Sequence, residues 1–123
     1  MILADTAIWV DHLNRGDARL AALLEAEEIV LHPHVLGEIA LGSLRNRAAI
    51  LGALAAMPFV MVAGEDEVLA LIEQRRLFGT GIGLVDAHLL ASALLTHETK
   101  LWTRDRRLRE AAERLGVAGE PGR

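Results

Sequence analysis

The chain has 123 residues, of which 52% are hydrophobic and 24% are charged, and it contains no cysteine. This composition excludes a disordered chain, a disulfide scaffold and a cysteine nucleophile, and the length suits a single domain with its own core. The net charge of −4 excludes a protein coated in basic residues, and two Trp, two Phe and no Tyr leave few platforms for stacking bases.

The chain carries no recognisable membrane or export signal. No apolar run approaches the ~18 residues that span a membrane, and the N-terminus lacks the basic and then apolar profile of a signal peptide. We therefore expect a cytoplasmic protein that makes no membrane contact.

Short apolar runs alternate with helical patterns along the chain. In chain order we expect a strand at 2–4, helices at 6–13 and 18–26, a strand at 28–31, helices at 34–44 and 45–57, a strand at 59–62, helices at 65–78 and 84–95, a strand at 101–102 and a helix at 104–115. Such alternation is typical of an α/β fold with a parallel sheet covered on both faces. We expect one domain over 1–118 and a loose tail over 119–123.

Four carboxylates lie where ligands bind in such a fold, beyond the carboxyl ends of strands or early in helices near them. Asp5 follows the first strand, Asp105 follows the last, Asp86 opens an apolar helix, and Glu38 is the only charged residue within 35–44. Converging carboxylates repel one another unless a cation lies between them, and oxygen ligands favour Mg²⁺ or Mn²⁺. A divalent ion held in this way activates water beside a phosphoryl group. The set therefore indicates phosphodiester hydrolysis.

Each acid also has a purely structural interpretation. Asp5 and Asp105 are placed to cap helices, and a carboxylate at position 86 is favoured by the helix dipole alone. Glu38 could be buried in an ion pair with an arginine. The hydrolytic hypothesis depends on the four acting as a set.

Four segments carry a resemblance to a known family. They are LADT at 3–6, GEIALG at 37–42, GIGLVDAHLLA at 81–91 and WTRDRRL at 102–108. In this order the chain resembles, over essentially its whole length, the PIN-domain nucleases and in particular the VapC-type toxins of bacterial toxin–antitoxin pairs. The resemblance implies three α/β/α layers around a central parallel sheet of four or five strands.

The resemblance also implies a function and roles for single residues. Family members are Mg²⁺- or Mn²⁺-dependent endoribonucleases that cut structured RNA, often transfer or ribosomal RNA. They are usually homodimers, and a cognate antitoxin silences them in a larger complex that binds operator DNA through the antitoxin. By position, Asp5 and Asp86 are the metal ligands and Glu38 and Asp105 complete the catalytic pocket. Thr6 and Thr103 would orient a carboxylate or water.

Arginines surround Asp105. Arg106 is spaced to pair with Glu110 on a solvated helix face, which leaves Arg104 and Arg107 as the candidates for contacts with RNA phosphates.

Three histidines attract attention without indicating a site. His32 and His34 flank a proline at a helix start and are expected to point in different directions, so a structural role is favoured over a metal site. His88 lies about 200° around the helix from Asp86 and is expected to be buried or to face a partner.

Two other functions remain open. A structure-specific DNA nuclease would use similar acids but needs additional helices to thread its substrate, for which 123 residues leave little room. A non-catalytic binding module would have no need of clustered like charges.

Overall fold

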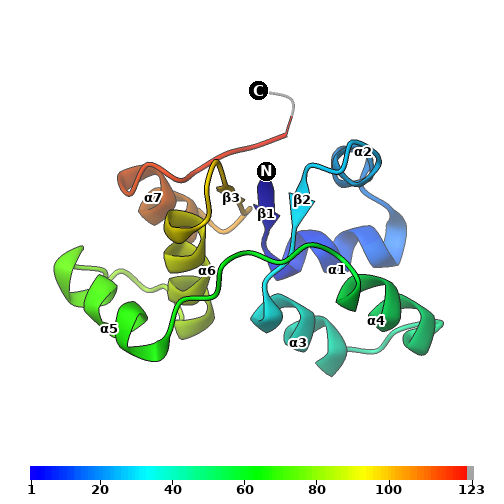
Figure 1. Ribbon diagram of the computed structural model, residues 1–123, viewed down its shortest axis with the longest axis horizontal. Coiled ribbons are helices and arrows are strands. Elements are labelled where there is room, and N and C mark those ends of the chain that lie inside the picture. Colours follow the sequence, from blue (N-terminus) through cyan, green and yellow to red (C-terminus); the bar gives the residue numbers. More distant parts are fainter. Residues whose placement is uncertain (122–123) are drawn as a thin grey trace.

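The computed structural model describes residues 1–121 and forms an α/β domain of three strands and seven helices over that range (Figure 1). The elements in chain order are β1 (Ile2–Ala4), α1 (Thr6–Arg15), α2 (Ala18–Glu25), β2 (Ile29–Val30), α3 (Pro33–Leu41), α4 (Arg47–Ala55), α5 (Glu65–Gln74), α6 (Leu84–Leu95), β3 (Lys100–Trp102) and α7 (Arg106–Arg114).

The strands form one parallel sheet in the order β2-β1-β3. In the register, Ile2 lies opposite Ile29 on one side and opposite Lys100 on the other. Because all three strands run in the same direction, their carboxyl ends meet at one edge. Helices lie on both sides: Figure 1 shows α1–α4 on the β2 side and α5–α7 on the β3 side. The predicted α/β/α class is confirmed.

The expected number of four or five strands is wrong for the described part of the chain. Outside the three strands, only single bridges extend the sheet, from Leu31 to Phe59 and from Leu101 to Ala118. The expected strand at 59–62 does not continue because its backbone turns toward α6. The Met61 amide donates to Thr96 Oγ1 at 2.9 Å rather than to the neighbouring strand.

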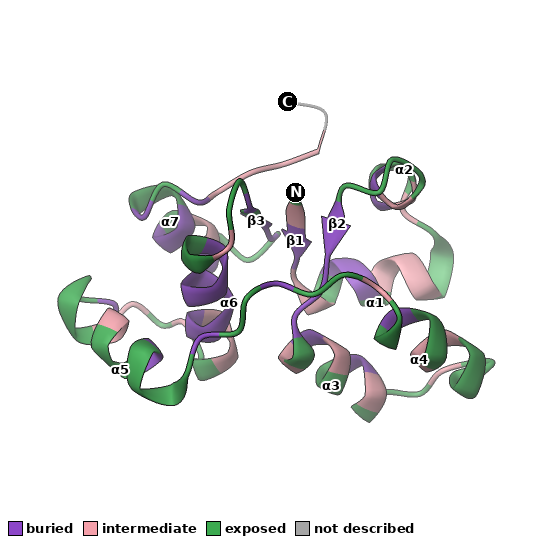
Figure 2. Cartoon of the chain, in the orientation of Figure 1, coloured by how far each residue is buried: buried purple, intermediate pink, exposed green. Residues whose placement is uncertain are grey.

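The core lies in the sheet and in the central turns of α6 (Figure 2). Leu3, Leu101 and Trp102 are at most 1% exposed. In α6 the residues from Ala87 to Ala93 are all buried, as the apolar pattern predicts, whereas Leu84, Leu94 and Leu95 at its two ends are exposed.

Several helix boundaries differ from the sequence prediction. Helix α5 ends at Gln74 rather than near 78, since Arg76 takes the left-handed conformation with φ +53°. Leu69 of α5 is 60% exposed. Helix α4 is confined to 47–55, where only Leu54 is buried.

The end of the described chain contacts the domain. The Gly119 amide donates to the Leu101 carbonyl at 3.0 Å, and Glu120 lies 4.0 Å from the Arg19 guanidinium. The rest of the expected tail, 122–123, falls outside the described residues. Within 1–121 no helix is both long enough and apolar enough to cross a membrane.

Candidate functional site: a carboxylate cluster at the carboxyl edge of the sheet

Asp5 is fixed at the end of β1 by two hydrogen bonds. Its Oδ1 accepts from the Thr6 amide at 2.7 Å, which caps α1, and its Oδ2 accepts from Thr103 Oγ1 at 2.8 Å. Thr103 directly follows β3, the strand paired with β1, so the two side chains meet across neighbouring strand ends. Asp5 therefore combines the structural role of a cap with a place in the cluster, since each carboxylate oxygen has a second lone pair.

Asp105 joins the same arrangement from the start of α7. Its Oδ1 accepts from the Leu108 amide at 3.0 Å, and its own amide donates to Thr103 Oγ1 at 3.0 Å. One buried hydroxyl, that of Thr103, thus links Asp5 to the segment that carries Asp105.

Glu38 reaches the cluster from α3. Its Oε1 accepts from Thr6 Oγ1 at 2.5 Å, so a hydroxyl from the first turn of α1 holds it. Glu38 is exposed and has no arginine partner within the described residues. The buried ion-pair interpretation is therefore wrong. An exposed glutamate on an otherwise apolar segment does not have to be neutralised.

Asp86 is half-buried in the first turn of α6, where its Oδ2 accepts from the Gly83 amide at 3.0 Å. Burial raises its pKa above the ordinary value; the Gly83 hydrogen bond opposes this shift, and the negative charges of Asp5, Asp105 and Glu38 add to it. Because all three act on Asp86, the structure brings the four acids together at one edge of the sheet. They come from the ends of β1 and β3, from the second half of α3 and from the first turn of α6.

The chemistry of this donor set suits a hard divalent cation. All donors are oxygens, and Mg²⁺ in proteins keeps several waters while taking one or two carboxylates directly. Among residues 1–121 no three His, Asp or Glu side chains lie close enough together to coordinate a metal ion without other ligands. The cluster therefore fits an ion with two direct carboxylate ligands better than a closed protein cage.

The two candidate RNA-binding arginines have different surroundings. The Arg104 guanidinium forms ion pairs with Asp11 of α1 and with Asp17, the cap of α2. These pairs compete with any contact to a phosphate. The hydrogen bond from the Leu20 amide lowers the pKa of Asp17 most, and the bonds from the Arg19 amide and from Arg104 lower it further. Arg107 is exposed and has no ion pair among the described residues.

Gly81 meets Arg107 where α7 faces the loop before α6. A Cβ at Gly81 would lie 2.8 Å from Arg107 Cδ and Nη1, and its φ of +87° lies in the region that favours glycine. The side chain of Arg107 thus packs directly on the loop that leads to Asp86.

A histidine cluster beside the acids is a feature that sequence reasoning missed. The His34 and His88 ring centroids lie 4.5 Å apart and those of His32 and His34 lie 4.9 Å apart, so the expectation that His32 and His34 diverge is wrong. His32 and His88 are at most 2% exposed, and His32 Nδ1 accepts from the His34 amide at 2.9 Å. Burial, and then the neighbouring His34 and His88, lower the pKa of His32 to about 4. The burial expected for His88 is confirmed.

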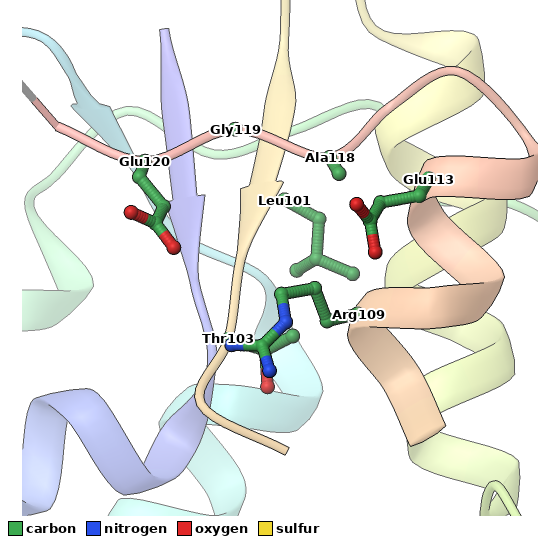
Figure 3. A pocket seen from close by; sticks show the side chains of 7 residues that line it. All are labelled: Leu101, Thr103, Arg109, Glu113, Ala118, Gly119 and Glu120. Atoms are coloured by element: carbon green, nitrogen blue, oxygen red, sulfur yellow. The ribbon is translucent and has the colours of Figure 1, made fainter. Parts of the chain in front are cut away.

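A separate hollow lies on β3 away from most of the acids (Figure 3). It is lined by Leu101, Thr103, Arg109, Glu113, Ala118, Gly119 and Glu120. Figure 3 shows the Arg109 side chain extending from α7 toward Thr103, with Glu113 and Glu120 on either side. None of the four acids of the cluster lines this hollow, so it is not the candidate site.

The fold is that of a PIN domain. The PIN domain model matches residues 2–114, a span that contains all four acids, and the chain belongs to this family. Over 118 residues the chain is 48% identical to Ribonuclease VapC32 of Mycobacterium tuberculosis, in strains CDC 1551 / Oshkosh and H37Rv, with 96% of this chain and 95% of the relative covered. The resemblance read from the sequence is confirmed.

Solved structures agree on the fold. FitAcB from Neisseria gonorrhoeae matches with a TM-score of 0.64 at 23% identity, covering 96% of this chain and 95% of that chain. A toxin–antitoxin complex from Klebsiella pneumoniae matches with a TM-score of 0.63 at 24% identity, covering 85% of this chain and 87% of that chain.

Proposed function

We propose that this protein is a VapC-type ribonuclease, the toxin of a toxin–antitoxin pair, and that it is an endoribonuclease dependent on Mg²⁺ or Mn²⁺. The observation that carries the proposal is the convergence of the carboxylates. Thr6 bonds both Asp5 and Glu38, and Thr103 links Asp5 to the Asp105 segment; the charges of these three acids also help to raise the pKa of Asp86, after its burial. The 48% identity to a protein named Ribonuclease VapC32 supports RNA as the substrate. Structured RNA, either transfer or ribosomal, is the expected target class.

The residues of the site divide the work between binding and orientation. Asp5 and Asp86 would hold the divalent ion, which when bound supplies a Lewis acid that activates water and stabilises charge on the phosphoryl group. Asp105 and Glu38 complete the negative pocket. The hydroxyl of Thr103 orients the Asp5 carboxylate, and the hydroxyl of Thr6 orients the Glu38 carboxylate. No side-chain nucleophile is required.

Contacts with the RNA backbone fall to Arg107, with a smaller part for Arg104. Arg107 is unpaired and lines a hollow with Asp105 and Arg106. Arg104 has to break its ion pairs with Asp11 and Asp17 before it can bind a phosphate. Its main role is therefore to hold the Asp105 segment against α1, and its role in substrate binding is secondary.

Protein partners complete the proposal. Soluble monomers rarely leave large apolar side chains exposed in groups, and here Leu41 is 89%, Met61 63% and Leu84 59% exposed. We expect such side chains to be covered in a homodimer and in a complex with a cognate antitoxin. That larger complex would bind operator DNA through the antitoxin. The similarity to a solved toxin–antitoxin complex favours this arrangement.

The test is cleavage of a structured RNA pool by the protein purified away from any antitoxin. We expect cutting with Mg²⁺ or Mn²⁺, none with chelator, and none by Asp86→Asn. Asp66→Asn is the matched control, because Asp66 is an exposed acid in the first turn of α5. Cutting in chelator would contradict the metal role, and full activity of Asp86→Asn would remove this residue from the site. Cutting of flap DNA but not RNA would favour a DNA nuclease.

A further inference from the structure

Most of the arginines in the described part of the chain already have partners. Arg15, Arg104 and Arg106 form ion pairs with carboxylates. Arg47 donates to the carbonyls of Gly42 and Ala40. Free guanidinium groups are therefore informative, because they keep their full attraction for an external anion.

Two hollows lie along α7, and the first of them begins at Asp105. Arg107 lines one hollow with Asp105 and Arg106, and it also lines the next hollow with Thr80, Glu110, Ala111 and Arg114. Because Arg107 belongs to both, the two hollows adjoin. Arg114 lies seven residues further along the same helix and so on the same face, about 10.5 Å away along the axis.

The second hollow is joined to the end of α5 through Arg114. Arg114 Nη2 donates to the Arg75 carbonyl at 2.8 Å and to the Arg76 carbonyl at 3.5 Å, which fixes the α5 terminus against the end of α7. Arg75 and Arg76 are both exposed. Figure 1 shows α5 and α7 on the same side of the sheet. We call Arg107, Arg75 and Arg76 the arginine track; the guanidinium of Arg114, already bonded to two carbonyls, connects the two helices that carry it.

The track concentrates positive charge on a chain whose net charge is −4. Glu110 also lines the second hollow, but its carboxylate lies 3.3 Å from the Arg106 guanidinium, so it does not neutralise the positive charge of the track. The one aromatic ring beside the described part of the track is Phe78, which is 54% exposed and lies 5.8 Å from the Arg76 guanidinium. A surface of guanidinium groups without base-reading side chains suits a phosphate backbone and is indifferent to sequence.

We propose that the arginine track binds the phosphodiester backbone of the substrate RNA on one side of the cut and directs the strand from the acids along α7 to the end of α5. This inference rests on the proposed function and adds to it the path of the strand. Arg107 binds next to the scissile phosphate, and Arg75 and Arg76 bind phosphates several nucleotides away. Substrates too short to reach the α5 terminus lose the last two contacts.

Binding and turnover test the track separately from the chemistry. In an Asp86→Asn background, which prevents cutting, the anisotropy of a fluorescein-labelled single-stranded oligoribonucleotide reports the affinity. We expect Arg75→Gln/Arg76→Gln to weaken binding roughly 5- to 10-fold and to lower the slope of log K against log salt by roughly 1. In the cutting-competent chain the same pair should raise KM more than it lowers kcat. Arg75→Gln alone should give part of each effect, and it spares the left-handed position 76.

The matched control is Arg15→Gln/Arg45→Gln, which removes the same two positive charges from exposed positions on other elements. It should change neither affinity nor KM by more than about twofold. An equal loss in the control would overturn the track in favour of net charge. Unchanged RNA affinity in the Arg75/Arg76 pair, with loss of binding to an oligoglutamate peptide, would overturn it in favour of an acidic protein partner. If the parent background binds no RNA, it is the proposed function that fails.

Discussion

Two polar clusters lie near the carboxyl edge of the sheet, and they are built in opposite ways. Asp5, Asp86 and Asp105 each accept a backbone N–H at a helix start. In the histidine cluster, His32 Nε2 and His88 Nδ1 are buried with no hydrogen-bond partner among the described residues. The first cluster gathers carboxylates whose repulsion a cation would offset, whereas in the second burial lowers the pKa of His32, and His88 Nε2 lies 3.8 Å from the exposed Glu65 carboxylate. Changes in the first should alter activity and changes in the second should alter stability.

The largest expected effect is on activity. Asp5→Asn keeps an oxygen for the Thr6 amide but loses the charge, so RNA cleavage should fall by at least about 10²–10³-fold, the usual size when one stabiliser of transition-state charge is lost. The thermal midpoint should move by only a few degrees. Kinetics on the cleaved RNA together with a circular dichroism melt check both parts. A cooperative melt that disappears along with activity would mean that Asp5 is mainly a cap.

The histidine cluster predicts a loss of stability in acid. His32 has a folded pKa of about 4 against an ordinary value near 6.5, so below pH 6.5 the unfolded chain takes up a proton that the folded protein refuses. The stability is present above pH 6.5 and is lost as the pH falls toward 4, by up to roughly 3 kcal/mol.

Denaturant unfolding at several pH values measures this loss. His32→Asn keeps an acceptor for the His34 amide and removes the titrating group, so its stability should vary less than that of the parent over pH 6.5 to 4. An identical pH profile in both proteins would assign the acid sensitivity to other groups.

The contrast also explains what the sequence could and could not predict. Acids at strand ends can be predicted from the sequence because a strand ends at a definite residue and the carboxyl ends of parallel strands meet at one edge of the sheet. This argument is enough to predict that Asp5 and Asp105 lie close together. Arg104 looked like a phosphate ligand because it adjoins Asp105, but its partners Asp11 and Asp17 are far away in sequence. Only the pairing of β3 with β1, the strand that leads into α1, brings them within reach.

The histidine cluster could not be predicted for the same reason. His88 lies more than 50 positions beyond His34 in the chain, and no local pattern relates them. The predicted strand at 59–62 is absent for another reason. Its residues are typical of a strand, but backbone amides of this region donate to side chains in and just after α6, Met61 to Thr96 and Ala63 to Ser92. Local propensity was overridden there by tertiary hydrogen bonding.

The link between the two strand ends is tested by Thr103→Val, which preserves the shape of a side chain that is 3% exposed. The variant loses the bond to Asp5 and leaves the Asp105 amide without its acceptor, so we expect a loss of about 1–2 kcal/mol of stability together with lower activity. Thr103→Ser retains the hydroxyl and should recover most of the activity. If serine does not rescue activity, the methyl group rather than the hydroxyl matters.

The smallest expected effect is a gain in stability. Burial and three neighbouring carboxylates raise the pKa of Asp86, so its ionised form opposes folding at neutral pH when no cation is bound. Asp86→Asn keeps an acceptor for the Gly83 amide and should therefore be slightly more stable than the parent at pH 7 in chelator. As the pH falls through the raised pKa toward 3.8, the parent also becomes neutral at this position and the difference should vanish. Mg²⁺ should raise the melting temperature of the parent more than that of the variant, because a cation offsets the same repulsion. A less stable Asp86→Asn in chelator would mean that the helix-start interaction of the charge outweighs its burial and its neighbours.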